Sequence, residues 1–392
     1  MSTKAKPRSS ILSQSARKLF LRDTLVFATL TCITLVLYGF TLLLFRSFES
    51  HRASLAVYWS DRGQDEMSHG QPNQAATSLR NAISYAPDDR RYELLLAQAL
   101  SEAGQTDQAI NYFLNLWESQ PGDGFINLEL GRLSSKKGLT QQAINYYRAA
   151  IFGDWQGDGP TRRRNVRLEL ADYLTSIHNL AAARTELLIA SGNAENDAMI
   201  NLSLGGKFAA IGDIPNALNS YKKVLVDKPH DLSALEAAGR LSLQSGDYAA
   251  AHGFFVEALE AGIEDANLRG RVLAANEEAE RLEDLAFSPN MPDYKRAEHL
   301  MMGKAIAEAR YNSCTMQLGE TAQPPVDMLD LKPRWRAAEN IRTRALKEDD
   351  GLQESLSSLI RDTEVVASKV CGPPSGDDAI LLRLAESREP NQ

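Results

Sequence analysis

Two consecutive stretches of 34 residues decide the fold: AVYWSDRGQDEMSHGQPNQAATSLRNAISYAPDD (56–89) and RRYELLLAQALSEAGQTDQAINYFLNLWESQPGD (90–123). Counted from the first residue of each stretch, glycine occupies position 15 (Gly70 and Gly104) and alanine occupies position 20 (Ala75 and Ala109). A fixed period of roughly 20 to 50 residues is typical of repeat proteins, in which each unit buries its apolar face only against its neighbours. The sequence therefore predicts an array of stacked units.

The same spacing continues along the chain. A third stretch, 124–157, follows without a gap. Six residues, Asp158 to Arg163, then interrupt the phase, and we expect them to form a loop. Three further units follow at 164–197, 198–231 and 232–265, of which the first is the weakest match. The predicted array thus covers residues 56–265.

The recurring residues have physical roles that fit two helices per unit. Small residues at positions 8, 20 and 27 allow two helix backbones to cross closely. Glycine at position 15 closes the first helix in a left-handed conformation, which costs a residue without Cβ little. Proline at position 32, as in Pro87 and Pro121, stands where the second helix cannot continue.

These markers resemble those of tetratricopeptide (TPR) repeats. The resemblance implies an all-α solenoid of about six helix–turn–helix units, whereas a generic helical bundle or a solenoid of another period is the alternative. Residues 266–286 carry many charges and predict a capping helix at the open end of the array. The C-terminal region, 293–392, is expected to be helical (294–318, 334–347, 353–370 and 379–386), with residues 320–333 as a linker or loop.

An apolar run precedes the array. Residues 24–45 (TLVFATLTCITLVLYGFTLLLF) contain no Asp, Glu, Lys, Arg or His. At about 1.5 Å per residue they span roughly 33 Å, enough to cross a hydrocarbon core of about 30 Å. The run predicts a retained signal anchor with one transmembrane helix, and a cleaved signal peptide or a soluble core helix are the alternatives.

Charge predicts the orientation of this helix. Residues 1–23 carry six Lys or Arg and one acid, whereas the whole chain has a formal charge of −8. Basic residues favour the cytoplasmic side, so we expect a cytoplasmic N-terminus, an inner-membrane location and a periplasmic array. A cytoplasmic array is the alternative. The acidic body argues against nucleic-acid binding, which needs a basic face.

The resemblance also implies where a partner binds. In TPR arrays, positions 2, 5, 9 and 12 line a concave groove formed by the first helices of successive units. Carried onto this chain, the groove residues that we single out are Arg91, Leu94, Gln98, Phe125, Leu128, Arg132, Leu168, Asp172, Met199, Leu202 and Arg240. We expect the apolar members to hold an extended or helical segment, and the arginines to bind carboxylates. The Lys and Asn set that binds chaperone tails in some TPR proteins is absent as a set.

Two of the three cysteines lie outside the apolar run, at Cys314 and Cys371. On the oxidising side of a membrane, two such thiols predict a disulfide, and two unrelated buried thiols are the alternative.

The body of the chain contains a basic run of Arg162, Arg163, Arg164 and Arg167. This run predicts either a site for an acidic peptide or anionic polymer, or a solvated inter-repeat loop and helix start.

No pattern in the sequence indicates catalysis. The six histidines are scattered and the cysteines do not cluster, so neither a metal site nor a Cys/His nucleophile is predicted. No cofactor is expected, and no residue is singled out as catalytic. The leading hypothesis is a membrane-anchored, non-enzymatic scaffold or assembly factor that binds protein partners. The alternative is an accessory or regulatory subunit of envelope polysaccharide synthesis or secretion machinery.

Overall fold

The structure is a computed structural model that describes residues 11–192, 194, 197–288, 291–319 and 325–387. Lys4, Lys6 and Arg8 of the predicted basic N-terminus lie outside the described residues. The chain divides into two units, one up to Leu170 and one from Ala171 onward, and each is described by itself.

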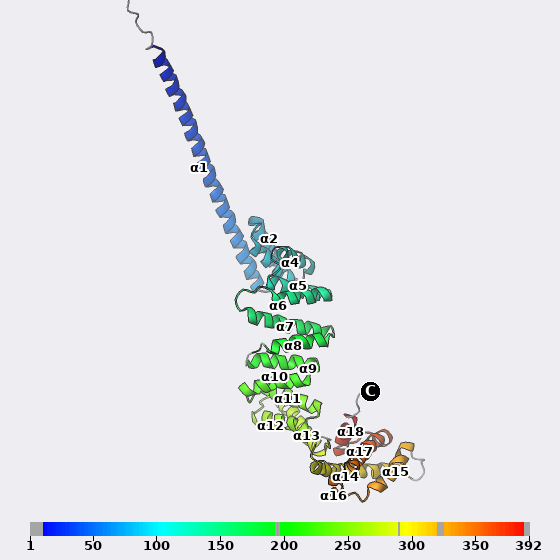
Figure 1. Cartoon of the computed structure of the whole chain (residues 1–392). Coiled ribbons are helices and arrows are strands. Elements are labelled where there is room, and N and C mark those ends of the chain that lie inside the picture. The colour runs from blue at the N-terminus through cyan, green and yellow to red at the C-terminus, as the bar shows by residue number, and fades with distance from the viewer. Residues whose placement is uncertain (1–10, 193, 195–196, 289–290, 320–324, 388–392) are drawn as a thin grey trace, which may run out of the picture. The chain divides into compact units, whose positions relative to one another are not determined.

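The first unit is built from helices that pair in chain order (Figure 1). Its helices are α1 (Ile11–Ser68), α2 (Pro72–Tyr85), α3 (Arg90–Glu102), α4 (Thr106–Ser119), α5 (Gly124–Lys136), α6 (Thr140–Phe152) and the first part of α7 (Gly159–Ser176). A continuous core runs through α2, α3, α4 and α5, with Leu79, Leu96, Phe113 and Leu130 fully or almost fully buried.

The second unit continues the pairing and then changes architecture. It contains the rest of α7, α8 (Leu180–Gly192), α9 (Ala198–Ala210), α10 (Ile214–Asp227), α11 (Leu232–Ser245), α12 (Tyr248–Glu260), α13 (Ala266–Leu285), α14 (Asp293–Leu318), α15 (Val326–Ala338), α16 (Thr343–Glu348), α17 (Asp350–Cys371) and α18 (Asp377–Glu386). The helix pairs confirm the prediction of an all-α, helix–turn–helix solenoid followed by helices.

Close helix crossings explain the glycines at position 8. A Cβ built on Gly205 would lie 2.6 Å from the ring of Tyr221, and one built on Gly239 would lie 2.6 Å from the ring of Phe255. Both aromatic rings stand at position 24 of the same repeat. Glycine at position 8 therefore makes room for the large side chain of the second helix.

Position 15 closes the first helix of each pair with positive φ. Five repeats use glycine there, at Gly70, Gly104, Gly138, Gly212 and Gly246. The fourth repeat has His178 instead, and it adopts the same left-handed conformation with φ of 58°. His178 is the one described residue other than glycine that has positive φ, so this repeat keeps the turn at a conformational cost.

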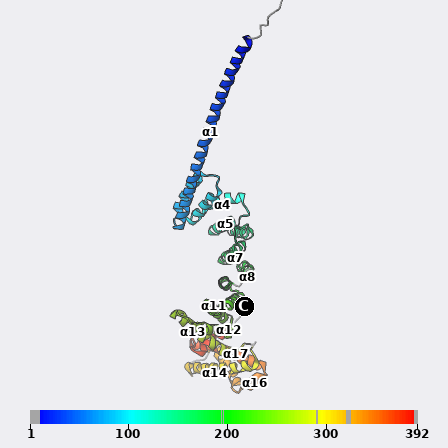
Figure 2. The ribbon, with the colours of Figure 1, turned by 90° about the vertical axis from the view of Figure 1, so that its left-hand side faces the viewer.

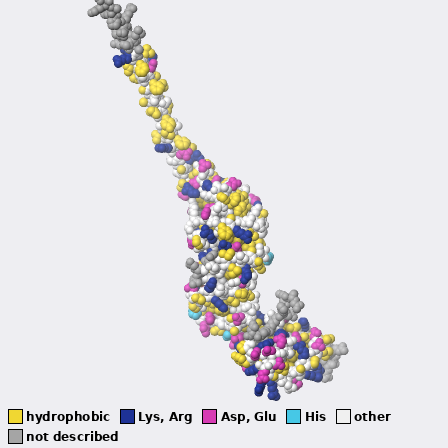
Figure 3. Space-filling model, in the orientation of Figure 1, with side chains coloured by type: hydrophobic (Ala, Val, Ile, Leu, Met, Phe, Trp, Pro, Cys, Tyr) yellow, Lys and Arg dark blue, Asp and Glu magenta, His cyan; other side chains and the backbone are white. Residues whose placement is uncertain are grey.

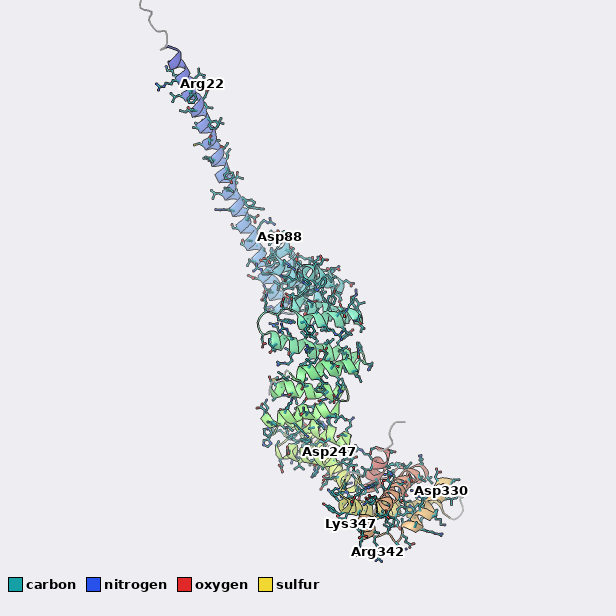
Figure 4. All side chains as sticks on the ribbon, viewed as in Figure 1. Arg22, Asp88, Asp247, Asp330, Arg342 and Lys347 are labelled. Carbon is teal, nitrogen blue, oxygen red and sulfur yellow. A yellow bond between two sulfur atoms is a disulfide. The ribbon has the colours of Figure 1, made fainter. Side chains whose placement is uncertain are left out.

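Helix α1 is continuous from the apolar run into the first repeat (Figures 1 and 2). No glycine or proline occurs between Phe40 and Arg62, so nothing in the sequence interrupts the helix. Its last part packs against α2, and the loop with Asp88 between α2 and α3 lies beside it, near Glu49 and Arg52 (Figure 4). The helix is long and apolar enough to cross a membrane, and none of the residues in its most apolar stretch is buried in the protein.

Two predicted loops are wrong over most of their described length, and residues 320–324 of the second lie outside the described residues. Residues 159–163 of the insertion belong to α7, which begins at Gly159, and Pro160 fits because the first helical turn needs no backbone N–H donor there. The segment 326–333 is the beginning of α15, which continues through Pro333. Met328, Leu331, Trp335 and Ala338 are its buried side chains and recur at helical spacing, with Pro325 before the helix and Pro333 within it. The helix predicted at 334–347 is split between α15 and α16.

The C-terminal helices α14 to α18 surround a core of their own. Leu300, Trp335, Leu356 and Ile360 are among its buried side chains. Leu243 of α11 packs against the same core, so these helices rest on the last repeat within the second unit. A disulfide joins Cys314 in α14 to Cys371 at the end of α17, with the two Cα atoms 5.7 Å apart.

Candidate partner-binding surface

The predicted groove residues of the first unit lie on α3, α5 and α7, and we call this surface the α3–α5–α7 face. Leu94 and Phe125 are half-buried and pack against the core of the first unit, and Leu168 is also half-buried. Leu128 is 7% exposed, so it is a buried side chain that supports this surface and contributes little to it. The face thus offers partly exposed apolar side chains on a fixed helical framework.

An ion-pair network joins α5 to α7 across this face. Arg132 donates from Nε and Nη2 to the two carboxylate oxygens of Glu169, each at 2.7 Å. Its Nη1 donates to Glu129 Oε1 at 2.7 Å, and the hydroxyl of Tyr147 donates to Glu169 Oε1 at 2.9 Å. Bidentate arginine–carboxylate pairing is among the stronger and more directional polar contacts in proteins. The network therefore fixes the first helices of two successive repeats relative to each other.

The network also sets the ionisation of its members. The Glu169 carboxylate raises the pKa of Arg132 above its usual range. Burial raises the pKa of the Tyr147 phenol, and the charge of Glu169 raises that pKa further. Tyr147 thus remains a neutral hydrogen-bond donor to Glu169 at physiological pH.

The other predicted arginines also have partners within the chain. Arg91 donates from Nη2 to Asp89 Oδ2 at 2.6 Å, and Arg240 forms an ion pair with Glu236 at 3.0 Å. The Arg91 side chain lowers the pKa of Asp89 through this contact. Each of these arginines is paired with a carboxylate one helical turn or less away in the sequence.

In the second unit, the predicted residues are spread over three helices. Asp172 on α7 accepts from the ammonium of Lys207 on α9 at 2.5 Å. On α9, Met199 is 78% exposed and Leu202 is half-buried. Arg240 lies on α11 and pairs with Glu236 of the same helix, whereas the Asp172–Lys207 pair joins α7 to α9.

Three network members were missed by the sequence analysis: Glu129, Glu169 and Tyr147. Glu129 could have been found, because it stands three residues before Arg132 on a predicted helix. Glu169 is 37 residues from Arg132, and no local sequence pattern indicates that the two side chains pair.

Among the described residues, no group of three or more His, Cys, Asp or Glu side chains is arranged to hold a metal ion.

Comparison with known families fits this architecture. Two models, both described as tetratricopeptide repeat, match residues 66–125 and residues 202–266. The chain is a tetratricopeptide repeat (TPR) protein. The matched segments contain the helix pairs with glycine at position 15 in both units, and TPR repeats are protein-interaction modules.

Solved structures resemble the TPR protein in fold. The C-terminal part of a TPR repeat-containing protein from Cytophaga hutchinsonii is 16% identical, with 62% of this chain and 92% of that chain covered and a TM-score of 0.46. A TPR protein from Parabacteroides merdae is 16% identical, with coverages of 59% and 91% and a TM-score of 0.40. PilW, described as a type IV pilus biogenesis factor, is 15% identical, with coverages of 55% and 98% and a TM-score of 0.40. No curated protein sequence matches the chain significantly.

Proposed function

We propose that this TPR protein is a membrane-anchored scaffold, exposed on the extracytoplasmic side, that binds a segment of a partner protein on its α3–α5–α7 face. The observation that carries the proposal is α1, a single helix that contains both the apolar run at 24–45 and the first helix of the first repeat. Such a helix holds the repeats at a fixed short distance from the membrane, because no flexible linker separates the two parts.

The contacts on the face indicate how the partner is held. Arg132 already donates hydrogen bonds from Nε, Nη1 and Nη2 to carboxylates of the chain itself. We therefore assign it to holding α5 and α7 together and not to binding a carboxylate of the partner. Leu94, Phe125 and Leu168 keep part of their apolar surface in solvent. The partner segment therefore binds mainly through apolar side chains that cover these three, as helical or extended segments do in helix-lined grooves.

The disulfide supports the extracytoplasmic side. Disulfides persist in oxidising compartments and are rare in the cytosol. Cys314 is 1% exposed and pairs with Cys371, which is half-buried. Cys32 in the apolar run is the free cysteine among the described residues.

Thiol labelling tests the sidedness. In a Cys32→Ser variant, intact spheroplasts are treated with a membrane-impermeant maleimide, before and after an impermeant reductant. We expect labelling only after reduction, because the bonded thiols face the outside of the cell membrane. Labelling that requires lysis of the spheroplasts would place the C-terminal helices in the cytoplasm and overturn the proposed topology.

Partner capture tests the face. Phe125→Glu puts a charge on the α3–α5–α7 face, whereas Val226→Glu puts the same charge at a side chain that is 85% exposed on α10. We expect a partner co-purified from solubilised membranes to be lost with Phe125→Glu and kept with Val226→Glu, while both variants retain the helical circular dichroism of the wild type. Equal recovery of the partner with both variants would show that the partner does not bind on the α3–α5–α7 face.

A further inference from the structure

A basic and aromatic cluster lies outside the α3–α5–α7 face. It consists of Phe152 at the end of α6, Trp155 in the following turn, and Arg162, Arg163, Arg164 and Arg167 in the first turns of α7. We call these six residues the basic–aromatic patch. All six belong to the first unit, and Figure 3 shows Lys and Arg side chains gathered at the level of α5 to α7.

The first three arginines lack carboxylate partners. In the part of the chain that the structure describes, no Asp or Glu forms a salt bridge with Arg162, Arg163 or Arg164. Arg163 donates to the carbonyl oxygen of Gly153 at 3.3 Å, and the buried Nε of Arg164 has no acceptor among the described residues. This contrasts with Arg91, Arg132 and Arg240, which are each paired with a carboxylate. Arg162, Arg163 and Arg164 therefore retain unused donors and uncompensated charge.

The nearest acid in the sequence is occupied. Asp158 accepts a hydrogen bond from the backbone N–H of Thr161 at 3.1 Å, as helix caps do. Its hydrogen bonds with Thr161 lower the pKa of Asp158, and the charges of Arg164 and Arg162 lower that pKa further. One carboxylate that caps the helix cannot also neutralise three arginines.

The position of these arginines on the helix is unfavourable for the isolated chain. Three of the first six residues of α7 are arginines, and its first turn contains no acid. The N-terminal end of a helix carries a partial positive charge, which favours anions and disfavours cations. A bound anion would be attracted by the helix end and the arginines together.

The aromatic side chains hold the arginines in place. The Arg162 guanidinium lies 5.7 Å from the centroid of the Trp155 ring, and that of Arg167 lies 5.8 Å from the centroid of Phe152. Trp155 is itself fixed, because its indole N–H donates to the carbonyl oxygen of Ala150 at 2.8 Å. Stacking of this kind orders the guanidinium of Arg162, and the N–H groups at the rim of that guanidinium have no carboxylate partner among the described residues.

From these observations we infer that the basic–aromatic patch binds an acidic peptide segment of a partner protein, independently of the α3–α5–α7 face. The planar guanidinium groups match carboxylates, which they bind in bidentate fashion. Phe152 is 78% exposed and supplies an apolar contact for side chains between the acids. The body of the chain is acidic overall, so attraction of an acidic segment has to come from a local surface such as this one.

Two other anionic ligands fit less well. A sugar acid needs a free aromatic face for its ring, but the Trp155 ring already contacts Gly124 and carries Arg162. Anionic lipid headgroups fit poorly because the apolar run of α1 extends away from α6 and α7 within the first unit (Figures 1 and 2). A peptide can reach the patch from solution without either constraint.

The test is a binding titration of the full chain in detergent micelles against fluorescein-labelled poly-L-glutamate. We expect saturable binding that weakens as salt is added, because exposed charges are screened. Arg162→Glu combined with Arg163→Glu should weaken binding by at least about tenfold, since the two residues supply central contacts. Arg162→Lys with Arg163→Lys should give an intermediate loss, because the charge remains and the planar fork is removed.

Matched variants separate a local site from general charge. Lys222→Glu with Lys228→Glu makes the same change of charge on and just after α10, and its binding should stay within about twofold of the wild type. Phe152→Ala should weaken binding by a few-fold without changing the circular dichroism, because the side chain is 78% exposed.

The inference is overturned if the Arg162/Arg163 double Glu variant binds poly-L-glutamate as the wild type does. It is equally overturned if the control pair loses binding to the same extent. Tighter, patch-dependent binding of polygalacturonate or of phosphatidylglycerol vesicles would identify a sugar acid or a lipid surface as the ligand instead. Loss of partner capture by Phe125→Glu with unchanged poly-L-glutamate binding would leave this inference intact, so the two proposals fail separately.

Discussion

Arg132 and Glu169 stand 37 residues apart in the sequence and form a two-bonded ion pair at 2.7 Å that ties α5 to α7. The two side chains are 42% and 32% exposed, so solvent weakens the attraction without removing it. Arg132, which the sequence analysis predicts to bind partner carboxylates, thus links two successive repeats within the chain.

Glu169→Gln should loosen this link. We expect a loss of about 1 kcal/mol of local stability, because a partly exposed charged pair becomes a weaker neutral hydrogen bond. Hydrogen exchange in peptides from α5 and α7 should become about fivefold faster. Asp107→Asn, which breaks the more exposed pair with Lys137, is the control and should have a smaller effect. Unchanged exchange in α5 and α7 would show that the pair carries no stability.

Two adjacent glycines in α9, Gly205 and Gly206, should respond differently to substitution by alanine. A Cβ at position 205 would lie 2.6 Å from the Tyr221 ring, so Gly205→Ala should destabilise the second unit by about 1 to 3 kcal/mol. A Cβ at position 206 would lie 3.9 Å from the Tyr221 hydroxyl, so Gly206→Ala should be neutral or stabilising by up to about 1 kcal/mol. Thermal melts by circular dichroism compare the two, and equal shifts would contradict the close crossing of α9 and α10.

His178→Gly should stabilise the turn between α7 and α8. The histidine holds a φ of 58°, which glycine adopts without a Cβ penalty. We expect a gain of up to about 1 kcal/mol, reduced by the greater freedom of glycine in the unfolded chain. The melting temperature is the measurement, with Gly212→Ala as the reverse control that should lower it. A lower melting temperature for His178→Gly would mean that the imidazole makes a stabilising contact.

Sequence reasoning found the parts of the fold that the repeat period controls. Position 15 predicted the left-handed turns, and even the repeat that lacks glycine keeps the turn at His178. Position 8 predicted the close crossings that Gly205 and Gly239 make against aromatic rings. These features follow from local conformation and from spacing, which a single sequence displays.

Features that depend on distant contacts could not be predicted in the same way. The Arg132–Glu169 pair requires knowledge of which helix faces meet. Residues 326–333 are predicted as part of a linker or loop, whereas burial of Leu331 and Trp335 against the C-terminal core supports a helix that continues through Pro333. Tertiary packing overrode the local signal there. The groove residues themselves remain a prediction carried over from the family resemblance.

A buried carboxyl in the C-terminal core should make stability depend on pH. Glu364 is fully buried, and burial, aided by the charge of Asp378, raises its pKa from 4.5 to about 8, against the opposing effect of Arg310. Between these values the unfolded chain releases the proton while the folded chain keeps it. The free energy of unfolding of the C-terminal helices should therefore fall as pH rises from about 4.5 to 8.

Glu364→Gln should flatten that dependence, because the amide does not titrate. Hydrogen exchange of α17 peptides, corrected for the intrinsic pH effect on exchange, measures the stability at each pH. The wild type should lose protection as the pH rises and the variant should not. Identical slopes for the two proteins would show that Glu364 is ionised in the folded state.

Site-specific photocrosslinking in intact cells tests the central claim most directly, namely that the membrane-anchored α3–α5–α7 face binds a partner protein. A photoreactive phenylalanine analogue replaces Leu94, and in a separate control it replaces Val226, which is 85% exposed on α10. The account predicts a discrete, membrane-associated adduct from position 94 that is absent from position 226 and is lost when Phe125→Glu is added. The absence of an adduct at position 94, or an equal adduct at both positions, would contradict it.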